Sequence, residues 1–258
     1  MWAPPNSAVT VNGQFATVTG GGQFFLNDLN LQPGANTVTA TVTAPDGQTA
    51  NQVITITRSA AAAAQYIVTV PASGIIGPTE PFFAQVTIAR TDGGTLPAGH
   101  TMTLQCADGV PVFNVPQLGT SQCGYTGTGI ATVRVTVKNA LAVIIYSVAK
   151  TVIVKSAAEH LATVRAVYQN AVDRLKAGDK AGALNLFVGH AKVLHDTIFT
   201  ALGANLASAA AQGGTVASVH ATGSSAEVTV VRDVGAAKQA FFIYLLLGED
   251  GIWRIESM

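Results

Sequence analysis

The chain has 258 residues, no formal net charge at pH 7 and 11% charged side chains. This length accommodates two or three domains that each bury a core of their own. The sparse and balanced charge excludes a broad basic surface for nucleic acid or anionic lipid, and no stretch has the roughly 18 consecutive apolar residues of a membrane span.

Residues 1–58 show the alternation of a half-buried antiparallel sheet. Five segments predict strands, and the sequences VNG, QPGAN and PDGQ lie between them as turns. The pair Asn12-Gly13 suits a two-residue hairpin because both residues adopt positive φ readily. In the segment NTVTATVTA, valine and alanine alternate with threonine, so one face of that strand is apolar and the other is polar.

The stretch VTVNGQFATVTGGGQFFLNDLNLQPGANTVTATVTAPDGQTANQVITITR resembles the repeated Ig-like modules of bacterial cell-surface proteins. In those modules a VNG hairpin, an L..G.NT turn and a closing ITV.R strand recur. The resemblance implies a β-sandwich for residues 1–58. The sequence departs from the family in one respect, because the modules begin with two further strands that this chain lacks.

A sandwich without its front strands exposes apolar side chains and a row of unpaired backbone groups along one edge. Such an edge can accept a strand from another copy, which predicts a self-assembling extracellular fibre or filament subunit. Two alternatives stay open: a longer surface protein supplies the strands, or the five strands close without help. The residues expected at the assembly edge are Val9, Val11, Phe25 and Val38.

An Ala-rich linker is predicted at residues 59–65, and a second Ig-like sandwich at residues 66–155. Seven strand segments separated by turns that contain Pro, Gly and Asp fit a complete sandwich of about ninety residues. Cys106 and Cys123 lie in strand-like segments close in sequence, which predicts a disulfide on the scale of a hairpin. The alternative is two free buried thiols, which behave as small apolar side chains.

The pattern changes at Ser156. The sequence SAAE matches a capping box, and apolar residues then repeat at helical spacing until Gly178. Two shorter helices follow, and after QGG the period becomes two in four further strand segments. Helices followed by an antiparallel meander predict an α+β domain over residues 156–258, with the helices on one face of a curved sheet. The predicted fold is therefore multidomain, with two all-β sandwiches and one α+β domain.

The ending FFIYLLLGEDGIWRIESM resembles the last hairpin of NTF2-like or cystatin-like domains, in which a DG.W.I turn and strand close a curved sheet around a helix. The resemblance covers about residues 157–258. It implies a pocket between helix and sheet, and in some members an isomerase or dehydratase that uses Asp or His there. The residues expected to line this possible pocket are Tyr168, Phe241, Tyr244 and Trp253.

Catalytic side chains do not converge in this segment. His195 and Asp196 are neighbours and point about 100° apart on a helix, and the separation from His190 to His195 misses the same-face spacing of three or four. Glu227 and Asp233 stand at the two ends of one strand segment, and His220 precedes it. We therefore expect these residues to be solvated polar groups and predict no catalytic site.

The five histidines also lack the spacings of a metal site. His100, His160, His190, His195 and His220 form no HxH or HExxH pattern, and no CxxC is present. The sequence predicts no metal and no cofactor. No leader precedes the first strand, and the cysteine pair favours a secreted protein whose leader has been removed over a cytosolic one.

The sequence thus leaves two main interpretations. In the first, the chain is a non-catalytic structural protein of the cell surface whose partners are copies of itself or neighbouring domains. In the second, it is an accessory module that binds a small ligand, a peptide or a glycan. An isomerase-type enzyme is a third and weaker interpretation.

Overall fold

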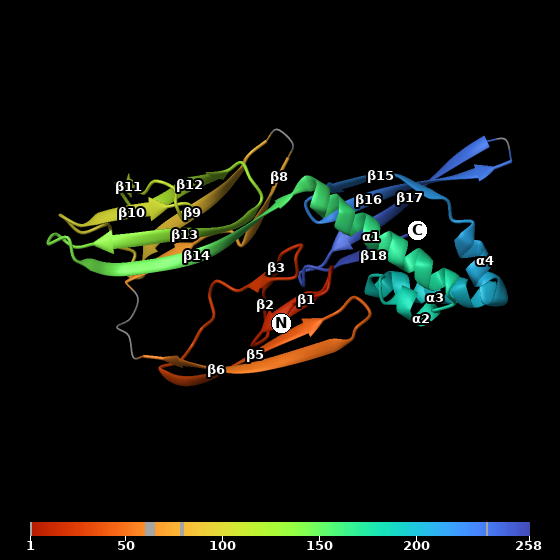
Figure 1. Cartoon of the computed structure of the whole chain (residues 1–258), viewed down its shortest axis with the longest axis horizontal. Coiled ribbons are helices and arrows are strands. Elements are labelled where there is room, and N and C mark those ends of the chain that lie inside the picture. Colours follow the sequence, from red (N-terminus) through yellow and green to blue (C-terminus); the bar gives the residue numbers. More distant parts are fainter. Residues whose placement is uncertain (1, 60–64, 78–79, 236) are drawn as a thin grey trace. The chain divides into compact units, whose positions relative to one another are not determined.

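The computed structural model describes residues 2–59, 65–77, 80–235 and 237–258 (Figure 1). The described chain is mostly β-sheet, with its helices gathered near the C-terminus. It divides into two compact units, one of residues 1–24, 40–52 and 158–258 and the other of residues 25–39 and 53–157. The predicted linker lies largely outside the described residues, and the division into three domains stays a prediction.

The N-terminal segment forms a four-stranded sheet in the order β2-β1-β5-β6 and a separate β3–β4 pair. The Asn12-Gly13 hairpin is confirmed, because Val11 pairs with Gln14 and both turn residues have positive φ, 49° and 82°. Within residues 23–31, QFFLNDLNL, only Phe24 and Phe25 form a strand. The strands are β1 (Ala8–Val11), β2 (Gln14–Phe15), β3 (Thr17–Val18), β4 (Phe24–Phe25), β5 (Gly34–Thr43) and β6 (Thr49–Arg58).

The residues expected at the assembly edge are not left uncovered in the structure. Val9, Val11 and Val38 are only 0%, 7% and 4% exposed, and Phe25 is half-buried. Val9 is covered by Ala3 and Val42 together with side chains of the β3–β4 pair and its surroundings, so these strands close a small core of their own. Exposed apolar residues lie instead on β6.

Residues 66–155 form a two-layer arrangement of antiparallel sheets, with one parallel pair between β8 and β14. One sheet has the order β11-β10-β13-β14-β8 and the other has the order β12-β9-β7. The strands are β7 (Tyr66–Thr69), β8 (Ser73–Ile76), β9 (Phe82–Arg90), β10 (Thr101–Gln105), β11 (Phe113–Val115), β12 (Gly119–Tyr125), β13 (Gly129–Lys138) and β14 (Ile144–Ser156).

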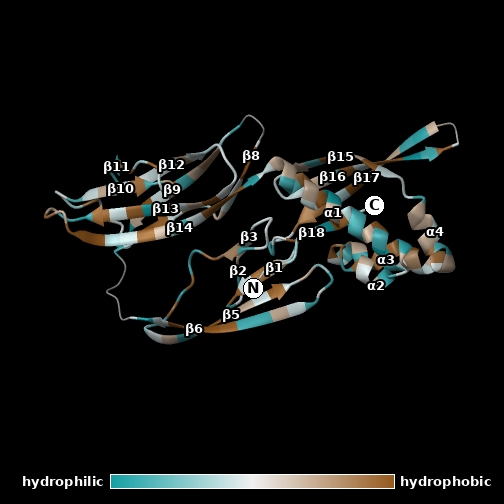
Figure 2. Ribbon diagram, viewed as in Figure 1, coloured by the Kyte–Doolittle hydropathy of each residue, from teal (hydrophilic) through white to brown (hydrophobic). Residues whose placement is uncertain are grey.

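The inner faces of both sheets share one core. Alternate residues of β9 and β13 are buried, as the period of two predicts, and brown and paler segments alternate along β13 and β14 in Figure 2. Strand β8 was not predicted. It is short and contains Gly74, where a Cβ would stand 2.2 Å from the ring of Phe82, so the close packing of that ring requires glycine.

The C-terminal segment is an α+β arrangement, as predicted. The helix expected after Ser156 is α1, and Asp179 caps α2 by accepting a hydrogen bond from the Gly182 N–H. The sheet has the order β15-β16-β17-β18. The elements are α1 (Ala157–Lys176), α2 (Lys180–Leu184), α3 (Gly189–Leu202), the 3-10 turn η1 (Gly203–Asn205), α4 (Leu206–Ala211), β15 (Thr215–Thr222), β16 (Ser225–Val234), β17 (Ala237–Leu247) and β18 (Trp253–Ser257).

The helices cover one face of this sheet. Buried side chains of α1 and α3 share a core with alternate residues of β16, β17 and β18. The members of this core that come from the sheet are Ala226, Val228, Val230, Ile243, Leu245, Trp253 and Ile255.

The N-terminal segment also closes the outer edge of β18. The amide of Asn6 donates to the Trp253 carbonyl at 3.2 Å and accepts from the Trp253 N–H at 2.9 Å. One side chain thus supplies both hydrogen bonds of a missing neighbouring strand. Asn6 has a φ of 56°, in the left-handed region that asparagine tolerates better than most residues. Further along, the backbone of Leu186 and Val188 bonds to Ile255.

Candidate functional site

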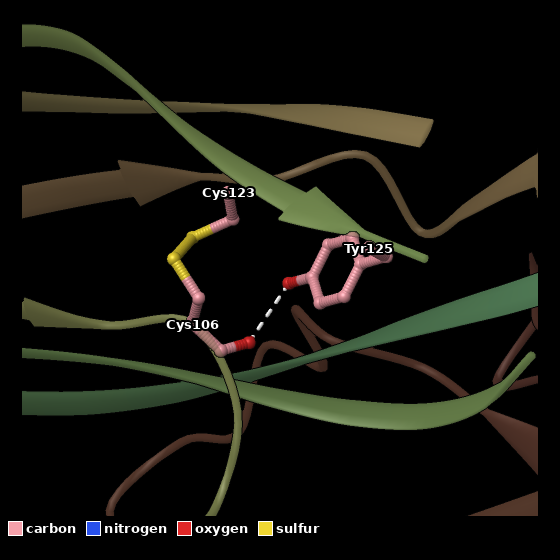
Figure 3. The surroundings of a disulfide bond; sticks show 3 residues. All are labelled: Cys106, Cys123 and Tyr125. Atoms are coloured by element: carbon pink, nitrogen blue, oxygen red, sulfur yellow. Dashed lines mark hydrogen bonds between the residues drawn. A yellow bond between two sulfur atoms is a disulfide. The ribbon is translucent and has the colours of Figure 1, made fainter. Parts of the chain in front are cut away.

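The predicted disulfide between Cys106 and Cys123 is confirmed (Figure 3). Their Cα atoms are 5.4 Å apart, and Cys123 is fully buried. Cys106 follows β10 and Cys123 lies in β12, which belong to different sheets. The bond therefore joins the two layers of the sandwich, not the two strands of one hairpin as its short sequence separation suggested.

Tyr125 seals the same end of the sandwich. Its hydroxyl donates to the Cys106 carbonyl at 2.8 Å, so a second interaction ties β12 to the end of β10 (Figure 3). Burial raises the pKa of Tyr125 to about 12, which keeps the phenol protonated and able to donate at any physiological pH. A surface hollow beside this point is lined by residues that include Cys106, Phe113 and Tyr125.

The four residues expected to line a C-terminal pocket do not come together. Tyr168 and Trp253 are 5% and 3% exposed and fill the core between helices and sheet. Phe241 and Tyr244 lie on opposite faces of β17, because side chains alternate along a strand and the two are an odd number of residues apart. These four side chains therefore do not line one common pocket, because two of them fill the core and the other two lie on opposite faces of β17.

The polar residues that were considered for catalysis are also dispersed. His195 is buried beside Phe187 at a ring distance of 4.6 Å, and its Nδ1 donates to the Ala191 carbonyl within α3. His190 is exposed, with Glu256 at 3.8 Å, and Asp196 pairs with Lys180 at 2.8 Å. His195 is thus a packed core residue, and the others pair at the surface.

The described residues, 2–59, 65–77, 80–235 and 237–258, offer neither a metal cluster nor a membrane-spanning helix. Among them, no group of three or more His, Cys, Asp or Glu side chains is placed to hold a metal ion. The helices among those residues are all too short or too polar to cross a bilayer.

The outer face of the C-terminal sheet carries two exposed aromatic rings. Phe242 and Tyr244 are 52% and 45% exposed and stand two residues apart on β17. In the sheet register Tyr244 lies opposite Glu227, which lies opposite His220, so a row of three hydrogen-bonding side chains crosses three strands. Flat apolar rings beside a carboxylate and an imidazole form a surface that can stack on and hydrogen-bond an extended ligand.

Strand β6 is the second exposed apolar feature. It is the terminal strand of its sheet, almost all of its residues are exposed, and Val53 and Ile54 are 59% and 50% exposed. The sequence could have indicated this exposed strand, because the consecutive Val53-Ile54 pair breaks the alternation of apolar and polar residues that β5 shows. A terminal strand that exposes an apolar side chain on each face is a candidate surface for contact with another chain.

Comparisons with known proteins give no family. No protein-family model matches the chain, and no curated protein matches it. Among solved structures, the fibronectin(III)-like modules of CbhA from Clostridium thermocellum match with 11% identity and a TM-score of 0.24, over 61% of this chain and 81% of that one.

Two further solved structures match in the same range. Domains 4 and 5 of the S-layer protein SbsC match with 13% identity and a TM-score of 0.20, over 60% of this chain and 73% of that one. The sialic acid binding region of a Streptococcus sanguinis adhesin matches with 14% identity and a TM-score of 0.22, over 93% of this chain and 56% of that one. All three are bacterial surface or fibronectin-like modules, but TM-scores this low carry no argument about fold or function.

The fold and the sites define the class of this protein from its own geometry. It is a mostly β protein with a two-layer sandwich joined by a disulfide and a C-terminal α+β segment. The resemblance of residues 157–258 to NTF2-like domains stays a prediction.

Proposed function

We propose that the protein is a non-catalytic structural module of the extracellular space or cell surface, and that its partners are copies of itself or neighbouring domains of a larger surface protein. The observation that carries this proposal is the disulfide between β10 and β12. Structural disulfides persist in secreted proteins and are rare in the reducing cytosol. A sparsely charged β surface rich in threonine and asparagine accords with that location.

The arrangement of polar side chains supports a structural role over catalysis. An isomerase-type enzyme needs a base inside a pocket, and here Tyr168, Trp253 and His195 pack into the core instead of lining one. Among the described residues, Lys180 pairs with Asp196 and His190 stands beside Glu256, so these polar groups lie at the surface and do not converge on one site.

Location can be tested on intact cells that produce the protein. Protease added outside should cleave it, and thiol titration of the denatured, unreduced protein should find no reactive cysteine. A protein that resists external protease until lysis and contains two reactive thiols would place it in the cytosol and reject the proposal.

A second candidate function follows from the aromatic face of the C-terminal sheet. Phe242 and Tyr244, with Glu227 beside them, could hold a glycan or an extended peptide, as an accessory binding module would. Glycan and peptide arrays probed with the parent protein and with Phe242→Ala/Tyr244→Ala separate the two functions. Binding that the double variant loses favours the accessory module, and an absence of binding to any array favours the purely structural role.

A further inference from the structure

Strand β6 presents a long free edge. It is ten residues long, pairs with β5 on one side and is the last strand of its sheet on the other. Its side chains are exposed on both faces, including Val53 and Ile54. A free edge of this length displays a row of backbone N–H and C=O groups that can pair with another strand.

The sequence of β6 lacks the features that protect natural edges. Edge strands are kept from pairing by lysines, inward-pointing charges, prolines or very short length. The sequence TANQVITITR contains no proline, no glycine, no lysine and no acidic residue, and its one charge is Arg58 at the last position. By contrast β7, another terminal strand, is only four residues long.

We propose that β6 pairs antiparallel with β6 of a second copy of this chain. This inference rests on the proposed structural role and gives it a contact surface. In an antiparallel pair centred on Ile54, Ile54 lies opposite Ile54 of the second copy on one face of the sheet, and Val53 lies diagonal to Val53 of the second copy on the other face, so apolar side chains meet in the middle. The two Arg58 side chains then stand at opposite ends. A parallel pair in register would place Arg58 beside Arg58, which is repulsive.

The geometry predicts a closed dimer and not a fibre. A two-fold contact uses the same patch on both copies and leaves no free copy of that patch for a third chain. The two four-stranded sheets would join into one eight-stranded sheet through β6. Because a single strand pair is a small interface, the dimer should be weak and concentration-dependent.

Sedimentation of the full chain over a wide range of concentration tests the association. The parent protein should shift from monomer to dimer, and Ile54→Lys should weaken the dimer by about tenfold or more. Ile67→Lys is the matched control, because Ile67 is a 53% exposed isoleucine on the terminal strand β7 and should leave the dimer unchanged. A parent protein that stays monomeric, or equal weakening by both variants, would overturn the proposal.

A distance between two spin labels measures whether the paired β6 strands run antiparallel or parallel. A spin label on Arg58→Cys should lie about 26 Å from its counterpart in the antiparallel dimer, since eight residues of strand at about 3.3 Å each separate the two positions. A short distance would show parallel pairing, and filaments in place of dimers would show an open contact; either would overturn the two-fold arrangement. A monomer that is still cleaved on intact cells would refute this inference alone and leave the surface role standing.

Discussion

Two β-regions of this chain share a sequence style and differ in what covers them. In the sandwich, Val133, Val135 and Val137 of β13 are 1%, 0% and 0% exposed because a second sheet faces them. In the N-terminal sheet, Val53 and Ile54 of β6 are 59% and 50% exposed. Alternation identifies the apolar face of a strand, but a second layer is needed to bury it.

The difference shows how an incomplete sandwich can still be ordered. The first strands gather around Val9 and Val42, with Ala3 completing a core of only a few side chains. That core covers β1 and the C-terminal end of β5 and does not reach β6. Burial is therefore uneven within a single sheet, and the uncovered strand is the one at its edge.

The largest expected effect is a direct contrast between the two regions. Leu104→Ala in the sandwich core should lower the free energy of unfolding by about 2–5 kcal/mol, because Leu104 is fully buried and its removal leaves a cavity. Ile54→Ala should change the free energy of unfolding by about 0.5 kcal/mol or less, since the truncation of an exposed side chain removes little buried apolar surface. Urea titrations measure both. Equal losses would show that β6 is covered in solution.

The next largest effect is expected from the disulfide, which lies in the sandwich and not in the N-terminal sheet. Replacing both Cys106 and Cys123 by alanine should destabilise the sandwich by about 3 kcal/mol through the loop that the bond closes. Thermal melts of the double variant and of the reduced parent protein should agree, which controls for the lost thiol volume. A variant as stable as the oxidised parent would show that the second contact, from the Tyr125 hydroxyl to the Cys106 carbonyl, suffices to join the sheets.

A smaller effect is expected where the N-terminal segment closes an edge. Asn6→Gly keeps the positive φ of that position but removes both hydrogen bonds to Trp253, and should cost about 1–3 kcal/mol because a buried N–H loses its partner. Asn12→Gly, the same change at another positive-φ site in the exposed hairpin, should cost less. Denaturant melts that rank the two variants in reverse order would show that Asn6 does not close β18 in solution.

The smallest expected effect depends on pH. Burial alone raises the pKa of Asp250, but hydrogen bonds from Arg254 and the Ile252 N–H outweigh it and hold that pKa below the ordinary value of 3.8. A lowered pKa stabilises the folded state above 3.8, and this contribution is lost as the pH falls through the lowered value. Asp250→Asn should therefore be less stable than the parent at neutral pH and lose less stability on acidification. Melts at several acidic pH values measure the difference, and parallel losses in both proteins would contradict it.

Much of the fold could be predicted because its determinants are local. The Asn12-Gly13 turn, the helix that begins after Ser156 and the alternation along β13 follow from backbone preferences and side-chain periodicity. The cysteine pair could also be predicted from composition. Its role in joining two sheets could not, because sequence separation does not reveal which sheet each strand enters.

The candidate sites were harder to predict because they depend on long-range packing. Trp253 was expected to line a pocket, yet its ring packs into the core. Its backbone is hydrogen-bonded by Asn6, which is far away in the sequence. Tyr244 was expected in a pocket and lies on the open face of the sheet, because strand register sets its direction. Val9 and Val38 were expected at the assembly edge, and only the folded chain shows that both are buried while β6 is the terminal strand of the sheet.

Hydrogen exchange on β6 tests the central claim most directly. If β6 is an uncovered edge that pairs with a second copy, the amides of Thr49–Arg58 that do not face β5 should exchange rapidly at low protein concentration and slow as the concentration rises, while the amides of β13 stay protected throughout. Protection of every β6 amide at all concentrations would contradict the account, because it would show that the chain covers this edge by itself.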